Sequence, residues 1–499
     1  MKTLVWTLLL ISPFLSLKVQ AVIVVKELEA YKRCHYLITN TYPTNRTIIS
    51  KIKSRELTAE QACSNILKSI SFDNGSGFVT ENGTSLTPLS KKVLKTFNNL
   101  HRTWFPESII RSLHNCGKAT EEFIDIGEGA LFFTKALLDE SVEHKTVVTA
   151  DSSYDAVRES AIQNEVAISR YGSARLNRDN LEIIVAERNS GVDTDAYPDA
   201  YKSIPASDIE PIAIGEFLGI KPMVARQISR DPASTSIYQT YLPTDGIDLT
   251  KSFGAGVLGT VSFLMATNNY GDNAAVNGAS SVQRGWSKTV LDTFLCKTGE
   301  PLRFEDVTVQ EDVTDKTPAF REDISCQRCH SSLDPLAGVI RNIRHYRSVR
   351  NTCAGNSNRG EALTRIAFSR KMSTTKSAHP DGFMADPDSN YMYRPTEGRL
   401  TYRDYDGNLI KIDLNNLEEL GEALSGNNDF YACSVNKYLN YFTGLEVSLN
   451  EIPPQSRGSY AKDYLELRRF VISEGLKLKE HQNVKKTISN IMKSKYFKK

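Results

Sequence analysis

The sequence predicts a mainly α-helical protein with a small β-hairpin near its C-terminus. In several segments apolar residues recur three and four positions apart, which is the spacing of an amphipathic helix. The alternation of apolar and polar residues that indicates a half-buried strand is scarce. The clearest strand signal comes from residues 400–403 and 409–412, which flank Asp406-Gly407-Asn408, a sequence typical of a hairpin turn.

Helices are expected wherever apolar residues share one face. The segments with this spacing are 123–137, 282–294, 417–424, 435–442 and 464–471, and a further closing helix is expected near Ile488. We expect Gly444 to end the fourth of them. The apolar stretch 253–265 is too short to span a membrane and is expected to form a buried helix.

Long polar connections separate these helices. They are expected at residues 73–82, 189–211, 267–281 and 351–396. The last is too long for an ordinary connection, so we expect it to be functional or to be ordered in part by a ligand.

The composition is that of a globular protein without a strong charge bias. Of the residues, 40% are hydrophobic and 24% are charged. The length of 499 residues is enough for roughly two to four domains. Lysine and arginine total 61 against 59 acidic residues, a net charge of +2. This balance gives no electrostatic footprint for nucleic acid or for a polybasic membrane contact, and we expect neither partner.

The N-terminus has the features of an export signal. Lys2 is followed by a mostly apolar run over residues 4–17, and Val19-Gln20-Ala21 presents small residues at the two positions that a signal peptidase reads. We expect cleavage after Ala21. The alternative is a membrane anchor, but the run is shorter than the roughly 20 residues that span a bilayer. The predicted location is therefore periplasmic or extracellular, with no membrane span after cleavage.

The chain has eight cysteines, an even number that favours disulfides in an exported protein. Two of them, Cys326 and Cys329, belong to the motif described next. The other six allow at most three bridges, whose pairing the sequence leaves open. They are Cys34, Cys63, Cys116, Cys296, Cys353 and Cys433.

The segment Cys326-Gln-Arg-Cys329-His330 has the spacing of a c-type haem attachment motif. Two thiols three positions apart on a helical turn reach the two vinyl groups on one side of a porphyrin. The adjacent histidine then becomes the proximal iron ligand. We therefore expect one covalent haem c on Cys326, Cys329 and His330. The alternatives are a redox dithiol, which favours a thioredoxin-like alternation that is absent here, and half of a zinc site, which lacks a second close cysteine pair.

Asp334-Pro335 follows the motif and resembles the start of a new helix. Proline fits the first turn of a helix and aspartate fits the cap before it. We therefore expect the haem helix to end at Ser331 or Ser332 and a second helix to begin at Pro335. In this interpretation Asp334 is a cap with no role at the haem.

The residues after the motif give the chain a resemblance to a known family. Cys326 to Leu336 reads CQRCHSSLDPL and resembles the haem segment of planctomycete-type cytochrome c proteins, which are large secreted bacterial proteins. The similarity covers residues 280–445 best, with further matches at Arg284-Gly285-Trp286, Gly398-Arg399-Leu400, Asp404 to Gly407, and Phe430 to Cys433. The family usually has glycine directly after its DPL sequence, whereas this chain has Ala337-Gly338. The resemblance implies haem and secretion rather than a particular reaction.

A c-type haem has either a sixth iron ligand or an open face, and a sixth ligand is expected among the residues after the motif. Met384 and Met392 lie in the long polar connection and are the favoured candidates for this distal position. Other candidates are His345, Met372 and His379.

Four further residues could be ligands. Cys34-His35 has the haem spacing with the first cysteine missing, but a disulfide from Cys34, for example to Cys63, is the favoured interpretation. His101 and His114 lie near Cys116 and could bind metal, although such residues are more often satisfied polar groups on a helix face.

These expectations divide the chain into four parts and lead to three functional hypotheses. The parts are a signal peptide (1–21), a helical N-terminal region (22–280), a haem-bearing segment (281–350) and a region of loop, hairpin and helices (351–499). The favoured hypothesis is a secreted mono-haem cytochrome that transfers electrons to a redox partner protein, a carrier rather than a catalyst. The alternatives are a secreted binding or surface protein with a structural haem, and a haem enzyme or sensor with an open distal face.

Overall fold

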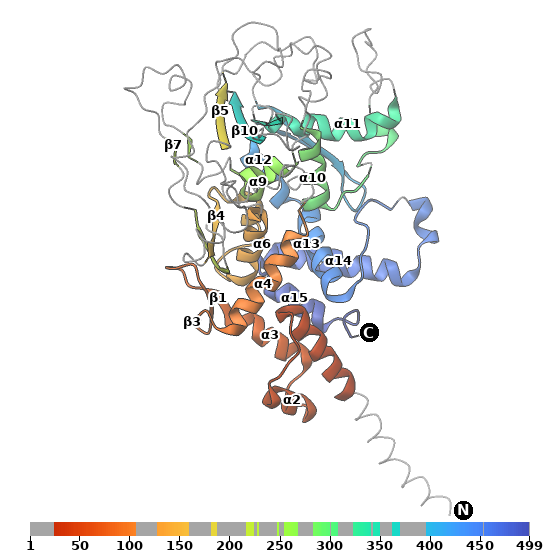
Figure 1. Cartoon of the computed structure of the whole chain (residues 1–499). Coiled ribbons are helices and arrows are strands. Elements are labelled where there is room, and N and C mark those ends of the chain that lie inside the picture. Colours follow the sequence, from red (N-terminus) through yellow and green to blue (C-terminus); the bar gives the residue numbers. More distant parts are fainter. Residues whose placement is uncertain are drawn as a thin grey trace, which may run out of the picture.

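The structure, a computed structural model, confirms a mainly helical protein with small antiparallel hairpins (Figure 1). It describes residues 24–105, 127–158, 181–186, 216–223, 227–228, 247–248, 254–267, 283–299, 301–307, 323–340, 343–349, 362–369, 396–452 and 454–498. The predicted signal peptide and most of the expected connections 189–211, 267–281 and 351–396 lie outside these residues.

The N-terminal part consists of helices around a small sheet. Its helices are residues 24–39, α2 (Arg46–Lys53), α3 (Ala59–Ser69) and α4 (Pro88–Arg102). Thr58 and Gln61 form a capping box that starts α3, and Thr87 caps α4, whose first residue is a proline. The sheet is antiparallel and contains β1 (Ile70–Phe72), β2 (Val79–Glu81) and β3 (Thr84–Ser85).

This sheet corrects the expectation of a simple polar loop at 73–82. Asp73 accepts hydrogen bonds from the backbone amides of Gly75 and Ser76, and this turn folds β2 back onto β1. The strands escaped sequence-based prediction because three residues carry too little alternation to be recognised.

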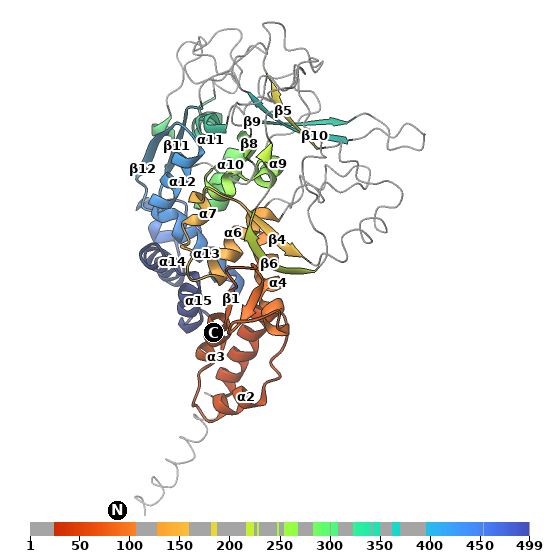
Figure 2. The same cartoon turned by 90° about the vertical axis from the view of Figure 1, so that its left-hand side faces the viewer.

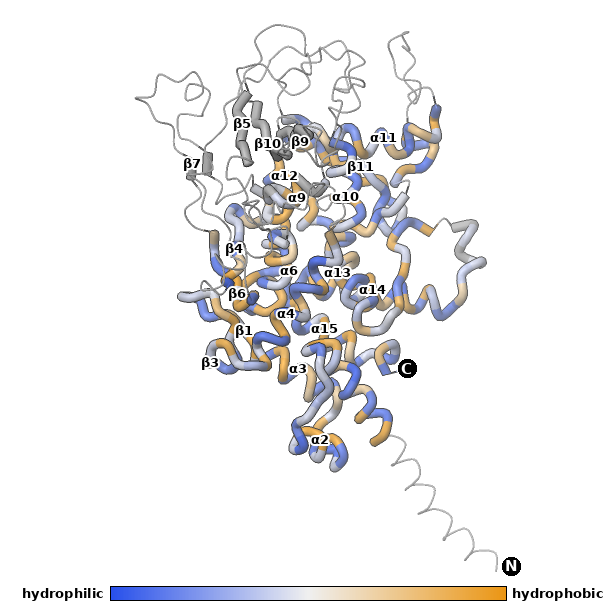
Figure 3. The backbone as a smooth tube through the Cα atoms, in the orientation of Figure 1, coloured by the Kyte–Doolittle hydropathy of each residue, from blue (hydrophilic) through white to orange (hydrophobic). Residues whose placement is uncertain are grey.

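The central part surrounds α6 (Glu128–Leu138), in which every residue is buried. Apolar residues dominate its tube in Figure 3. The neighbouring elements are α7 (Thr146–Thr149), η7 (Gly256–Gly259), α9 (Val261–Thr267), α10 (Arg284–Leu295) and η9 (Phe304–Asp306). The single helix expected at 253–265 is wrong: it is broken at Thr260, whose hydroxyl accepts from the Phe263 amide and so starts a new helix.

Strands also occur in this part where the sequence indicates none. Those paired in antiparallel fashion are β4 (Tyr154–Arg158) with β6 (Phe217–Pro222), and β7 (Gln227–Ile228) with β8 (Ile247–Asp248). A three-stranded sheet has the order β5 (Leu181–Ala186), β10 (Ala362–Ser369), β9 (Ile343–Val349), and β10 pairs with β5 in parallel. The stretch 351–396, expected to be loop throughout, thus contains a strand.

From β11 onward, the C-terminal part follows the sequence-based expectations closely. It contains α11 (Ile324–Ala337), η11 (Gly338–Ile340), β11 (Gly398–Arg403), β12 (Leu409–Leu414), α12 (Leu417–Gly426), α13 (Asn428–Thr443), η13 (Pro454–Ser459), α14 (Lys462–His481) and α15 (Val484–Lys493). The hairpin β11–β12 is confirmed, with Gly407 at a φ of 91° in its turn. Gly444 ends α13 in the left-handed conformation, as predicted.

One hydrophobic core joins the two ends of the chain. It extends from Tyr31 in the N-terminal helix to Phe497 after α15. Figure 2 shows α15 beside α3, and Lys485 of α15 donates to the carbonyl of Ile70 at 2.8 Å. The core therefore depends on contacts between residues more than 400 positions apart.

Candidate functional site

The Cys326–His330 motif lies on α11, at the edge of the molecule (Figure 1). Asp323 caps this helix by accepting a hydrogen bond from the Ser325 amide at 2.8 Å. Because a helix turns once every 3.6 residues, Cys326, Cys329 and His330 lie on one face of α11. All three side chains are half-buried.

One thiol of the motif lies against the segment that follows α10. Cys326 and Cys329 are not joined by a disulfide, and the Cys329 sulfur lies 3.7 Å from the Gly299 carbonyl. Arg328, between the two cysteines, donates to the Leu302 carbonyl at 3.0 Å, and its guanidinium lies 4.4 Å from the centre of the Phe304 ring. The position of α11 thus depends on residues 299–304.

His330 is oriented by a buried carboxylate. Its Nδ1 lies 3.2 Å from Oδ2 of Asp334, one turn further along α11. Arg284 of α10 also donates to that carboxylate, at 3.1 Å from its Nη2. Burial alone raises the pKa of Asp334, but the hydrogen bonds from His330 and Arg284 outweigh it, and the pKa lies below its usual value.

This arrangement assigns the proton of the imidazole. An ionised carboxylate only accepts, so Nδ1 of His330 donates to Asp334, and a metal ion could be bound only through Nε2, which carries the lone pair when the ring is neutral. Histidine ligands in metal sites are held in the same way, with the second ring nitrogen bonded to a carboxylate or carbonyl. The residues of α11 therefore fit a porphyrin iron: two thiols and an imidazole lie on one face, and Nε2 is the ring nitrogen that is not bonded to Asp334.

The structure corrects the expected helix boundary after the motif. α11 is continuous to Ala337 with Pro335 inside it, so neither an end at Ser331 or Ser332 nor a new start at Pro335 is found. Pro335 cannot donate to the Ser331 carbonyl. The helix is supported instead by its packing on β11, where the Ser332 hydroxyl donates to the Thr401 carbonyl at 2.6 Å.

Asp334 is consequently not a helix cap. Its side chain is committed to Arg284 and His330, and it is only 7% exposed. The i, i+4 spacing of His330 and Asp334 was a signal in the sequence for their pairing. Nothing local indicated Arg284, which lies 50 positions earlier in the chain.

The distal ligand candidates are mostly beyond the described residues. Met384, Met392, Met372 and His379 all lie outside them. His345 lies in β9, where it is paired with Ile366 of β10. The identity of a sixth ligand thus stays a prediction.

Two of the disulfides are described. Cys34 is bonded to Cys63, as the favoured interpretation had it, and His35 accordingly turns its Nδ1 to the Thr41 carbonyl at 2.7 Å. Cys296, at the end of α10, is bonded to Cys433 of α13. Cys116 and Cys353 lie outside the described residues.

His101 is a buried polar group with partners on both ring nitrogens. Its Nδ1 lies 2.8 Å from the Thr134 hydroxyl and its Nε2 lies 2.9 Å from the Tyr438 hydroxyl. Burial keeps its pKa well below the ordinary value. This confirms the satisfied-histidine interpretation; His114 lies outside the described residues. Among the residues described, no group of three or more His, Cys, Asp or Glu side chains is arranged to hold a metal ion.

A buried ion pair that the sequence did not reveal joins the segment after α10 to α13. Lys297 and Asp429 are 2.7 Å apart, and their side chains are 1% and 2% exposed. The Lys297 ammonium also donates to the Leu449 carbonyl at 2.6 Å. This pair fixes the start of the segment whose carbonyls contact Cys329 and Arg328.

Comparison of the chain with protein-family models, curated proteins and solved structures finds no match. None of the helices in the described parts of the chain combines the length and the apolar character that crossing a membrane requires.

Proposed function

We propose that this protein is an exported c-type cytochrome that carries one covalent haem on Cys326, Cys329 and His330 and transfers electrons to a partner protein. The observation that carries the proposal is the common face of α11: both thiols and the imidazole lie on it, and buried Asp334 directs the Nε2 of His330 away from its own carboxylate. Bound haem would supply a one-electron iron couple.

The chain's own residues have distinct tasks in this proposal. Cys326 and Cys329 hold the cofactor by thioether bonds, which requires their sulfurs to stay reduced until attachment. His330 is the proximal ligand. Asp334 holds its Nδ1 proton and so fixes the ring and increases its basicity, and Arg284 keeps that carboxylate ionised. The predicted export signal, the two disulfides among the described residues and the near-neutral charge are compatible with a periplasmic or extracellular carrier.

Cofactor attachment is tested by expressing the full chain in a bacterial host competent in cytochrome c maturation. We expect a coloured protein whose haem stays attached under denaturing conditions and gives a pyridine haemochrome spectrum typical of two thioether bonds. The double variant Cys326→Ser/Cys329→Ser should lose the covalent haem. Ser331→Ala, on the same helix next to His330, is the matched control and should retain it. A colourless wild-type protein would refute the proposal.

The electron-transfer role is tested separately on the haem-loaded protein. A reversible midpoint potential and a six-coordinate spectrum that is inert to CO support a carrier. A five-coordinate haem that binds CO or peroxide would instead favour the enzyme or sensor alternative.

A further inference from the structure

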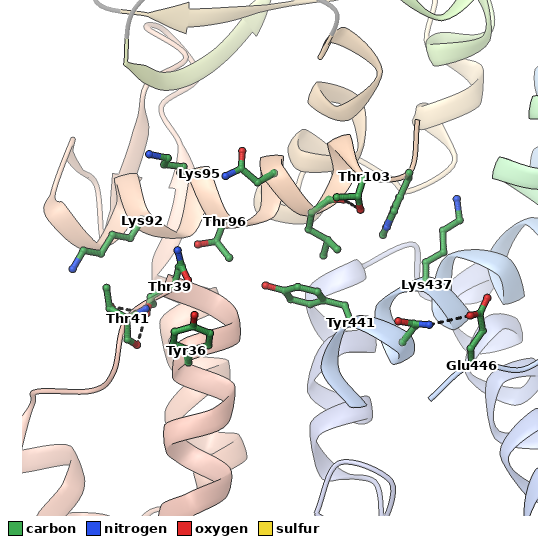
Figure 4. A pocket seen from close by; sticks show the side chains of 15 residues that line it. Tyr36, Thr39, Thr41, Lys92, Lys95, Thr96, Thr103, Lys437, Tyr441 and Glu446 are labelled. Atoms are coloured by element: carbon green, nitrogen blue, oxygen red, sulfur yellow. Dashed lines mark hydrogen bonds between the residues drawn. The ribbon is translucent and has the colours of Figure 1, made fainter. Parts of the chain in front are cut away.

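A second candidate site lies far from α11 in the chain, between the N-terminal helix, α4 and α13. It is a cavity of about 740 Å³. This volume falls in the range of pockets that bind small molecules, roughly 300–1,000 Å³. Its lining comes from the end of helix 24–39, from one face of α4 and from α13 (Figure 4).

The cavity is held open by contacts among its walls. Tyr441 of α13 crosses to the N-terminal helix, where its hydroxyl donates to the Leu37 carbonyl at 2.6 Å. The Cys34–Cys63 disulfide fixes the same helix to α3. The walls therefore belong to elements that the core already positions, so the cavity exists before any ligand arrives.

The charge of the lining favours an anion. Lys92 and Lys95 lie toward one end and Lys437 lies toward the other, with Tyr441 between them (Figure 4). Glu446 is the single acidic side chain among the described residues of the lining, and it already accepts a hydrogen bond from Asn440 at 3.1 Å.

Lys437 is the most informative of these cations. Its ammonium donates to the Thr293 carbonyl at 2.7 Å and lies 5.0 Å from the centre of the Trp104 ring. Among the described residues no carboxylate forms an ion pair with it, although Asp292 and Glu446 attract it from a longer distance. Burial outweighs this attraction and lowers the pKa of Lys437 to about 7, because desolvation disfavours a cation. A bound anion would supply a closer counter-charge.

The rest of the lining suits a ligand rich in hydroxyl groups. Thr96, Asn99 and Thr103 follow one another on the cavity face of α4, at spacings of three and four residues. Thr96 and Asn99 can donate and accept hydrogen bonds, and Thr103, whose hydroxyl donates to the Leu100 carbonyl, can accept one. At the rim, Tyr36 is 43% exposed and supplies the apolar face of its ring beside its own hydroxyl group.

We propose that this cavity binds an acidic sugar, that is, a hydroxyl-rich small molecule that carries a carboxylate. Lys437 takes the carboxylate, the threonine and amide side chains along α4 take the hydroxyls, and Tyr36 covers the apolar face of the ring. Lys92 and Lys95, at the other end of the cavity, add to its positive potential. This inference does not rest on the proposed haem.

The test is a calorimetric titration of the full chain with glucuronate, with glucose and acetate as comparison ligands. We expect glucuronate to bind more tightly than either. Lys437→Met should weaken binding about tenfold or more, since it removes a charged hydrogen-bond donor. Lys437→Arg should retain most of the affinity. Thr96→Phe should abolish binding by filling the cavity. The matched control is Lys51→Met, an exposed lysine of α2 outside the cavity, which should bind like wild type.

Three results would overturn the proposal. Equal affinity for glucose and glucuronate would show that charge has no part, and equal affinity for acetate and glucuronate would show that the hydroxyls have none. Absence of glucuronate binding at millimolar concentration would refute the site itself. If Thr96→Phe fails to fold, as judged by circular dichroism, Lys437→Met and Lys437→Arg still decide the matter.

Discussion

Removing only one partner of the ion pair between Lys297 and Asp429 is expected to lower the free energy of unfolding substantially. The substitution Lys297→Met keeps the length of the side chain but leaves the Asp429 carboxylate buried without its cation. Burial lowers the pKa of Lys297 and raises that of Asp429, because desolvation disfavours the charged form of each side chain. Removing one partner of such a pair costs about 3–5 kcal/mol.

The proton affinity of Asp429 sets an upper limit on this loss of stability. The orphaned Asp429 can escape its penalty by taking up a proton. At pH 7, protonating a carboxyl group whose ordinary pKa is 3.8 costs about 1.4 kcal/mol per pH unit, or about 4 kcal/mol in all. The two estimates agree, and we expect Lys297→Met to lower the free energy of unfolding by about 3–4 kcal/mol at pH 7. The loss should shrink by about 1.4 kcal/mol for each unit that the pH is lowered towards 4.

The assay is urea unfolding followed by circular dichroism, with the disulfides intact. The double variant Lys297→Met/Asp429→Leu removes both charges and should recover most of the loss, because a buried pair replaced by apolar side chains is often neutral. Lys51→Met, on the surface, should unfold like wild type. A loss below about 1 kcal/mol for Lys297→Met, or a double variant as unstable as the single one, would refute the reasoning.

Three further outcomes are expected. In the haem-loaded protein Asp334→Asn should raise the reduction potential, because His330 loses an anionic acceptor; a redox titration that finds an unchanged or lower potential would contradict this role. Gly475→Ala should destabilise the fold by about 1–3 kcal/mol in urea, since its Cβ would lie 2.7 Å from a Cα of α13, whereas Gly426→Ala, with nothing within 4 Å, should not. Burial lowers the pKa of His144 to about 3, below the 6.5 of the unfolded chain. The stability that neutral His144 gives the fold is therefore complete above pH 6.5 and is lost at up to about 1.4 kcal/mol per pH unit as the pH falls towards 3. The variant His144→Gln should show a pH dependence of the unfolding free energy that is flatter by that slope, and wild-type and variant profiles that run parallel would contradict this role.

Local patterns in the sequence were sufficient for several elements. The leucines of α12 and the apolar stripe of α13 recur at helical spacing, and both helices form where expected, with Gly444 at the end of the second. The hairpin β11–β12 forms around Gly407. The motif was also sufficient to place Cys326 and His330 on one helical face, because a face is a property of spacing alone.

Only the tertiary structure decided which distant residues meet. It pairs Arg284 with Asp334, Asp429 with Lys297, and Cys296 with Cys433. The physical reason is that a helix or a tight turn is stabilised by neighbours within four or five residues, which the sequence displays directly. A buried ion pair, a disulfide or a parallel strand pair is stabilised by chain segments that only the packed core brings together.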